Sequence, residues 1–236
     1  MNFPLPILRG TLLRRYKRFL ADVELESGAL VVAHCPNSGS MKTCAEPGRP
    51  VLLSDHGPGT PRKLRYTWEA IRMGRAWVGV NTLKPNRVVH EAVAAGKIPE
   101  LAGYAEHARE VVYGARGRSR IDVLLSGHRA RPDCYVEVKN TTMRVGEGSL
   151  FPDAVTERGR KHLEDLAREV RRGRRALIFF FVGRADCAWM GPADAIDPAY
   201  GRALRRAVKA GVEPLAYQAR VTPRGIALVR RVEVRL

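Results

Sequence analysis

The sequence has no apolar run long enough to cross a membrane, and no charged-then-apolar segment of the secretory type stands at its amino terminus. These absences argue against membrane and exported proteins and lead us to expect a cytoplasmic one. Cysteine is also scarce, and the few cysteines lack the close pairing of a zinc site. A disulfide between Cys35 and Cys44 is one alternative, but a signal-free chain more often keeps such thiols reduced and packed.

Negative charge is the second shortage. The chain carries 24 acidic residues against 41 basic ones, which gives a net charge of +17. Arginine outnumbers lysine by 33 to 8. Guanidinium groups suit bidentate contacts to phosphate, although a genome rich in G and C would also favour arginine codons. The positive excess itself predicts a polyanionic partner, and we expect single- or double-stranded DNA, bound largely without regard to sequence.

The chain has 236 residues, enough for one large domain or two modest ones. Residues 1–82 are expected to be all β, because short strand-like runs alternate there with turn-forming clusters. Strands of this length and spacing predict a small closed barrel of the oligonucleotide-binding type (OB fold). The predicted strands are Ile7–Leu13, Phe19–Leu25, Ala29–Ala33, Pro50–Ser54, Leu64–Ile71 and Ala76–Val80.

Residues 83–236 mix strands with helices. Pro85 can open a helix, and Asp153 is expected to cap a long helix that runs to Arg172. The wholly apolar run Leu177–Val182 is typical of a strand buried on both faces of a sheet. This order of elements predicts an α/β domain in which helices cover a mixed central sheet.

Two acids and a lysine interrupt neighbouring apolar strands of this second domain. Asp122 precedes Val123-Leu124-Leu125, and Glu137 and Lys139 follow in the run Cys134–Lys139. The turn-rich stretch between the two runs predicts a hairpin. Residues two apart on a strand share a face, so Glu137 and Lys139 point the same way. If the register brings Asp122 beside them, the three groups could form a magnesium-dependent phosphodiester-cleaving centre.

The alternative is a solvated strand face, on which Glu and Lys form ion pairs of little energetic value. The apolar neighbours argue against it, because charges embedded in apolar strands are costly to bury unless they are paired or bind a metal. In the catalytic interpretation, Asp122, Glu137 and the Val138 carbonyl would hold Mg²⁺ or Mn²⁺. Lys139 would orient or deprotonate the attacking water. Glu91 would supply a third acid from the preceding helix, although a lone helical Glu is more often solvent-facing.

A basic and aromatic run near the amino terminus is the predicted DNA contact. It comprises Arg14, Arg15, Tyr16, Lys17 and Arg18. Such a run could hold phosphates while a ring stacks on a base. The alternative is a solvated basic edge strand that discourages aggregation.

Two further features are candidates for phosphate contacts. Arg158 and His162 lie one helical turn apart, and near a scissile phosphate they could stabilise negative charge. The small-residue loop that follows Ala33 could bind a phosphate through its backbone amides. A nucleophile–base pair of His34 and Cys35 is disfavoured, because adjacent strand residues point to opposite faces. A structural loop is the favoured interpretation.

Nearly the whole chain resembles the sugar fermentation stimulation protein A family. The strings that carry the resemblance are Ala33–Met41, Arg62–Glu69, Val80–Thr82, Ser119–Asp122, Tyr135–Asn140 and Phe151–Thr156, followed by Arg158-Gly159 and Lys161–Leu163. The resemblance implies an amino-terminal OB-like barrel and a carboxy-terminal domain of the PD-(D/E)xK nuclease type. It also implies DNA binding without marked sequence preference and a role in regulating sugar (maltose) metabolism genes.

The nuclease motif of the family carries over onto Asp122, Glu137 and Lys139, with Glu91 as the helix acid. One departure is Lys17, where family members often have Asn, and it adds a cation where DNA contact is expected. The sequence therefore predicts a two-domain DNA-binding protein with a magnesium-dependent nuclease centre. The alternatives are a non-catalytic DNA-binding regulator of sugar (maltose) metabolism genes on a nuclease-like scaffold, and an RNA-binding protein of the same fold and charge.

Overall fold

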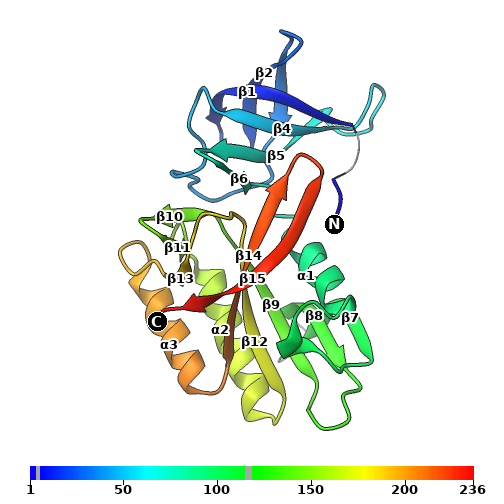
Figure 1. Cartoon of the computed structure of the whole chain (residues 1–236). Helices are drawn as coiled ribbons and strands as arrows, with labels where there is room; N and C mark the ends of the chain where they lie inside the picture. The colour runs from blue at the N-terminus through cyan, green and yellow to red at the C-terminus, as the bar shows by residue number, and fades with distance from the viewer. Residues whose placement is uncertain (4–5, 115–118) are drawn as a thin grey trace.

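The computed structural model describes residues 1–3, 6–114 and 119–236, and its first domain is a closed β-barrel (Figure 1). The strands pair in the order β3-β2-β1-β4-β5-β6, and a parallel pairing of β3 with β5 closes β1 to β5 into a ring. Leu12, Val23 and Trp68 lie in its apolar interior. The predicted OB fold is confirmed. The strands are β1 (Ile7–Tyr16), β2 (Leu20–Leu25), β3 (Leu30–His34), β4 (Pro50–Asp55), β5 (Tyr66–Met73) and β6 (Ala76–Gly79).

A mixed sheet forms the second domain, as predicted. In the described part of the chain its strand order is β10-β11-β13-β15-β14-β12-β9-β8-β7. At its centre, β12 (Arg175–Val182) runs parallel to both neighbours and is buried from Ala176 onward. The other strands are β7 (Glu106–Tyr113), β8 (Ser119–Ser126), β9 (Cys134–Thr141), β10 (Met143–Val145), β11 (Gly148–Phe151), β13 (Trp189–Pro192), β14 (Glu213–Thr222) and β15 (Gly225–Val234).

Helices cover both faces of this sheet (Figure 1). α1 (Pro85–Ala94) buries its apolar side in one core, and the short 3₁₀ helix η1 (Pro99–Leu101) follows it. α2 (Glu157–Arg171) and α3 (Pro198–Lys209) pack together on the opposite face in a second core. No helix within the described residues is long and apolar enough to cross a bilayer.

The long helix begins later than the sequence predicted. Thr156, not Asp153, is the N-cap of α2, and its hydroxyl accepts the N–H of Gly159 at 3.0 Å. The Asp153 carboxylate instead accepts the N–H of Met41 at 3.1 Å. Asp153 therefore links the second domain to the barrel, since Met41 belongs to the loop after β3.

The alternative disulfide is wrong, because Cys35 and Cys44 are buried free thiols. The strands β10, β11 and β13 were not predicted. Each has only three or four residues, too few for an alternating pattern to stand out in the sequence.

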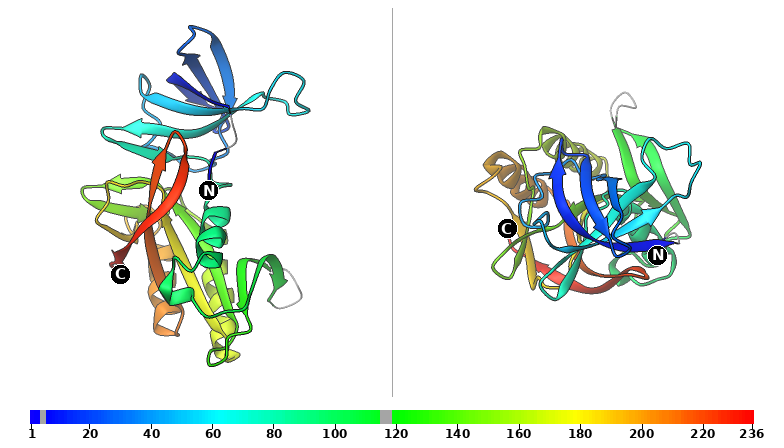
Figure 2. Two further views of the ribbon diagram at one scale, coloured as in Figure 1. Left: turned by 45° about the vertical axis from the view of Figure 1, so that its right-hand side comes forward. Right: turned by 90° about the horizontal axis from the view of Figure 1, so that it is seen from above.

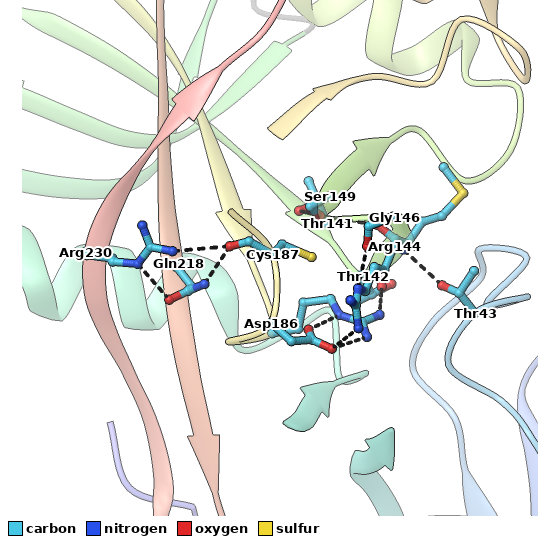
Figure 3. A network of polar contacts seen from close by, with 12 residues as sticks. Thr43, Thr141, Thr142, Arg144, Gly146, Ser149, Asp186, Cys187, Gln218 and Arg230 are labelled. Carbon is cyan, nitrogen blue, oxygen red and sulfur yellow. Dashed lines mark hydrogen bonds and ion pairs between the residues drawn. The ribbon is translucent and has the colours of Figure 1, made fainter. Parts of the chain in front are cut away.

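The two domains stack end to end (Figure 2), and hydrogen bonds join them. The β14–β15 hairpin reaches β6 of the barrel, and the N–H of Gly79 donates to the Gly183 oxygen at 2.8 Å. The backbone N–H of Arg144 donates to Thr43 Oγ1 of the barrel at 3.2 Å, while its guanidinium pairs with Asp186 at 3.0 Å (Figure 3). These contacts position the barrel over the sheet, so that one cleft can draw residues from both domains.

Candidate functional site

A cleft of about 550 Å³ lies between the two domains. The barrel contributes Arg18 and residues 37–39 to its wall. The second domain contributes residues of β8 and β9 and the beginnings of α1 and α2. The predicted motif residues Asp122, Glu137 and Lys139 all line this cleft. The structure thus brings the three side chains together, as the sequence predicted.

Asp122 extends from β8 into the cleft and accepts two hydrogen bonds. Its Oδ2 accepts the backbone N–H of Val138 at 2.7 Å, and its Oδ1 accepts Asn86 Nδ2 at 2.6 Å. The antiparallel register of β8 and β9 brings it close to Glu137. The half-buried carboxylate is thus held in one orientation by donors from β9 and α1.

Glu137 on β9 is almost fully enclosed, with 3 % of its surface exposed. Its Oε1 accepts a hydrogen bond from Lys139 Nζ at 2.6 Å and also contacts His162 Nδ1. Lys139 Nζ lies 3.1 Å from the same ring nitrogen, and Arg158 Nε lies 3.3 Å from the other one. The second oxygen, Oε2, is buried and has no hydrogen-bond partner among the described residues.

The two carboxylates titrate differently. Burial, followed by the charge of Glu137, raises the pKa of Asp122 to about 7. Burial also opposes the ionisation of Glu137, but Lys139 and His162 outweigh it and lower the pKa of Glu137. At neutral pH Glu137 is therefore charged while Asp122 is partly protonated. A cation bound between them would favour the ionised form of both.

These residues fit a divalent metal ion. The unpartnered Oε2 of Glu137 offers a buried oxygen ligand, and the neighbouring Asp122 carboxylate offers a second. Within residues 1–3, 6–114 and 119–236, no group of three or more His, Cys, Asp or Glu side chains is arranged for a metal. An ion in the cleft would therefore depend on two carboxylates, the Val138 carbonyl and water.

Glu91 does not belong to this arrangement. Its carboxylate pairs with the Met1 ammonium at 3.2 Å and with Arg87 at 2.7 Å, and it does not line the cleft. The α1 side chain that reaches the acids is Asn86. Five residues turn the helix by roughly 140°, so Glu91 faces another direction. The expected helix acid is thus corrected to a helix amide, which sequence reasoning missed because Asn in a first turn also suits ordinary capping.

The side chains of the basic run Arg14–Arg18 lie in different surroundings on the barrel. Arg18 lines the cleft. Arg14 pairs with Asp22 at 2.6 Å and lies 4.9 Å from the ring centroid of Tyr16. Lys17 is exposed, and it and Arg18 have φ angles of 48° and 63° at the tip of the β1–β2 hairpin. Of the five residues of this run, Arg18 is the one that lines the cleft, and the predicted contacts Arg158 and His162 line it from α2.

Arg15 supports the cleft wall instead of facing it. Its guanidinium donates to the carbonyl oxygens of Asn37 and Gly39, both at 2.9 Å, and of Ser40 at 3.2 Å. Its Nε donates to the Arg18 oxygen at 3.1 Å. Arg15 therefore fastens the hairpin tip to the neighbouring loop and positions both.

We expect Arg15→Ala to lower the free energy of unfolding by about 1–3 kcal/mol, because four carbonyl oxygens lose their donor. Arg14→Ala is the matched control. It removes an exposed ion pair with Asp22, and such pairs contribute little to stability, so its cost should be clearly smaller than that of Arg15→Ala. Urea unfolding of both variants measures the difference, and equal losses would contradict the positioning role of Arg15.

The loop after β3 packs against the barrel and against Asp153, and its residues 37–39 also line the cleft. Cys35 is buried in the barrel, and that burial raises the pKa of its thiol. His34 lines a different hollow, so the two do not form a nucleophile and base. A Cβ at Gly39 would collide with the Asp153 carboxylate. Glycine therefore permits the close approach of this loop to Asp153, a contact that the sequence analysis did not find.

The comparisons with known proteins cover the whole chain. The family models that match are the SfsA N-terminal OB domain over residues 13–80 and the sugar fermentation stimulation protein RE domain over residues 83–225. A sugar fermentation stimulation protein homolog from Geotalea uraniireducens is 54% identical over 236 residues, which is 100% of both chains. A homolog from Acidithiobacillus ferrooxidans is 54% identical over 229 residues, or 97% of each chain.

A solved structure is similar as well. It is that of Pyrococcus furiosus SfsA in complex with Ca²⁺, which is 25% identical, with a TM-score of 0.88 over 100% of this chain and 98% of the other. Identity above one half along the full length, together with matches in both domains, shows common descent. The chain belongs to the sugar fermentation stimulation protein family.

Proposed function

We propose that the protein binds DNA and hydrolyses its phosphodiester backbone in the cleft between the domains, with the help of a divalent metal ion. The convergence of Asp122, Glu137 and Lys139 carries this proposal. Paired carboxylates are ligands for a hard cation, and a neighbouring amine can act on water. The net charge of +17 supports a polyanionic substrate.

In this proposal the acidic residues of the motif bind the metal ion, and the lysine acts on the attacking water. Asp122, Glu137 and the Val138 carbonyl would hold Mg²⁺ or Mn²⁺. When bound, the ion would offset the negative charge of the scissile phosphate. Lys139 would orient the attacking water and, in its neutral form, accept its proton.

Basic side chains on the other walls of the cleft would bind the substrate. Arg158 and His162 on α2 lie beside Lys139, where they can stabilise negative charge on the phosphate. Arg18 lies across the cleft on the barrel and can hold an adjoining phosphate. The DNA strand would thus be bound by side chains of both domains.

The solved relative supports the metal site. Pyrococcus furiosus SfsA was solved in complex with Ca²⁺. Ca²⁺ and Mg²⁺ both select oxygen ligands, and the acids of this cleft offer such ligands. A divalent-cation site in this chain is therefore consistent with the family.

The test is incubation of the protein with supercoiled plasmid and with single-stranded circular DNA, in Mg²⁺, Mn²⁺ or EDTA. We expect nicked or shortened products with Mg²⁺ or Mn²⁺ and none with EDTA. Mg²⁺ should also raise the melting temperature beyond a control of matched ionic strength, because it binds the folded state.

Binding to both DNAs without cleavage by either ion would favour a second function, the non-catalytic regulator of sugar metabolism genes. The name that the relatives share, sugar fermentation stimulation protein, favours this alternative. No binding to either DNA would contradict both functions.

A further inference from the structure

A second hollow, of about 490 Å³, lies on the barrel. We call it the barrel groove. It is formed by residues of β2, β3 and β5 and by the β1–β2 and β4–β5 loops, and its lining includes Phe19, Val32, His34, Arg62 and Lys63. In OB folds this combination of strands and loops is the face that binds oligonucleotides. The barrel groove thus lies where the fold can present a ligand site.

The side chains of the barrel groove have two kinds of chemistry. Phe19 and Val32 are exposed by 49 % and 39 %, which leaves an aromatic ring and an apolar floor open to solvent. Arg62 and Lys63 stand exposed at its rim, and neither forms a salt bridge within the described residues. An exposed ring between free cations is the pairing that binds single-stranded nucleic acid, since the ring stacks on a base while the cations contact phosphates.

Consecutive residues of one hairpin tip line the cleft and the barrel groove. Arg18 lines the cleft and Phe19, the next residue, lines the barrel groove. Arg15 fixes the hairpin tip that carries them, through its bond to the Arg18 oxygen. A nucleotide whose base stacks on Phe19 would therefore have its phosphate within a short distance of Arg18.

We propose that the barrel groove binds an unpaired segment of DNA and leads its backbone into the cleft, so that the protein prefers single-stranded over duplex DNA. The physical reason is that a base can stack on Phe19 only when its own face is uncovered, and in a duplex the neighbouring bases cover it. The inference rests on the proposed DNA binding and specifies the form of DNA that is bound.

The test measures binding in EDTA, where cleavage cannot interfere. Fluorescence anisotropy would compare an oligothymidylate of about 16 nucleotides, the upper site size of one OB fold, with a duplex of the same length at one salt concentration. We expect tighter binding of the single strand, and Phe19→Ala should weaken that binding roughly 5- to 150-fold, the effect of losing one stacked base. Phe19→Trp should retain it.

Val229→Ala is the matched control, because it removes a side chain that is 44 % exposed on β15. It should leave both affinities unchanged. Equal affinity of wild type and Phe19→Ala for the single strand, or equal affinity of wild type for both DNAs, would overturn the inference and leave the proposed function standing. Failure of the wild type to bind either DNA would overturn both.

Discussion

Lys139→Met is expected to reduce metal-dependent DNA cleavage by about 10²- to 10⁴-fold, the usual contribution of a group that acts on the attacking water. The stabilisation by Mg²⁺ should persist or increase, because the ammonium at 2.6 Å from Glu137 Oε1 no longer competes with the ion. Cleavage rates and melting temperatures with and without Mg²⁺ measure the two effects separately.

Lys161→Met provides the control for this experiment. Lys161 is exposed on α2, next in sequence to His162, so the substitution removes the same charge without removing a contact to Glu137. DNA affinity should fall equally in the two variants, whereas cleavage should fall only in Lys139→Met. Parallel losses of cleavage would mean that Lys139 acts only through general attraction of DNA.

Asp122→Asn is expected to make the metal-free protein more stable at pH 8, by about 2–4 kcal/mol, although it removes a charged group from a hydrogen-bonded site. Burial and Glu137 raise the pKa of Asp122 to about 7, well above the ordinary value of 3.8 for an aspartate. The folded state therefore holds this proton more tightly than the unfolded state does. Stability is lost as the pH rises from about 4 to about 7, and the amide variant avoids that loss.

The same substitution should abolish the stabilisation by Mg²⁺. In the wild type this stabilisation should be larger at pH 8 than at pH 6, because the ion needs the ionised carboxylate. Chemical unfolding measures the free energy of unfolding at pH 6 and at pH 8, each with and without Mg²⁺. Asp194→Asn serves as the control, since Asp194 is exposed and its partner Arg205 lowers its pKa, so no gain at pH 8 is expected. A full Mg²⁺ effect in Asp122→Asn would remove Asp122 from the ligand set.

The central part of the candidate site was predictable from the sequence. Acids within apolar strands are rarely accidental, and the two-residue period of a strand puts Glu137 and Lys139 on one side whatever surrounds them. The turn-rich segment between the two runs then limits Asp122 to the neighbouring strand. These are local rules, and the hairpin of β8 and β9 obeys them.

The contributions of the helix and the barrel were not predictable in this way. Which residue of α1 meets Asp122 depends on the rotation of the helix about its axis, and that rotation is set by how its apolar side packs on the sheet. Packing selected Asn86 and directed Glu91 towards Met1. Similarly, the bonds of Arg15 to the loop near Gly39 depend on the closure of the barrel.

The barrel, the mixed sheet, the positive charge and the grouping of two acids with an amine were predictable from the amino-acid sequence, because each follows from composition or from the two-residue period of a strand. Three features are visible only in the folded protein: residues of both domains line one cleft, Asp153 joins the domains, and Phe19 lines a neighbouring groove. Those features depend on contacts between segments far apart in the chain, whose relative positions no local pattern encodes.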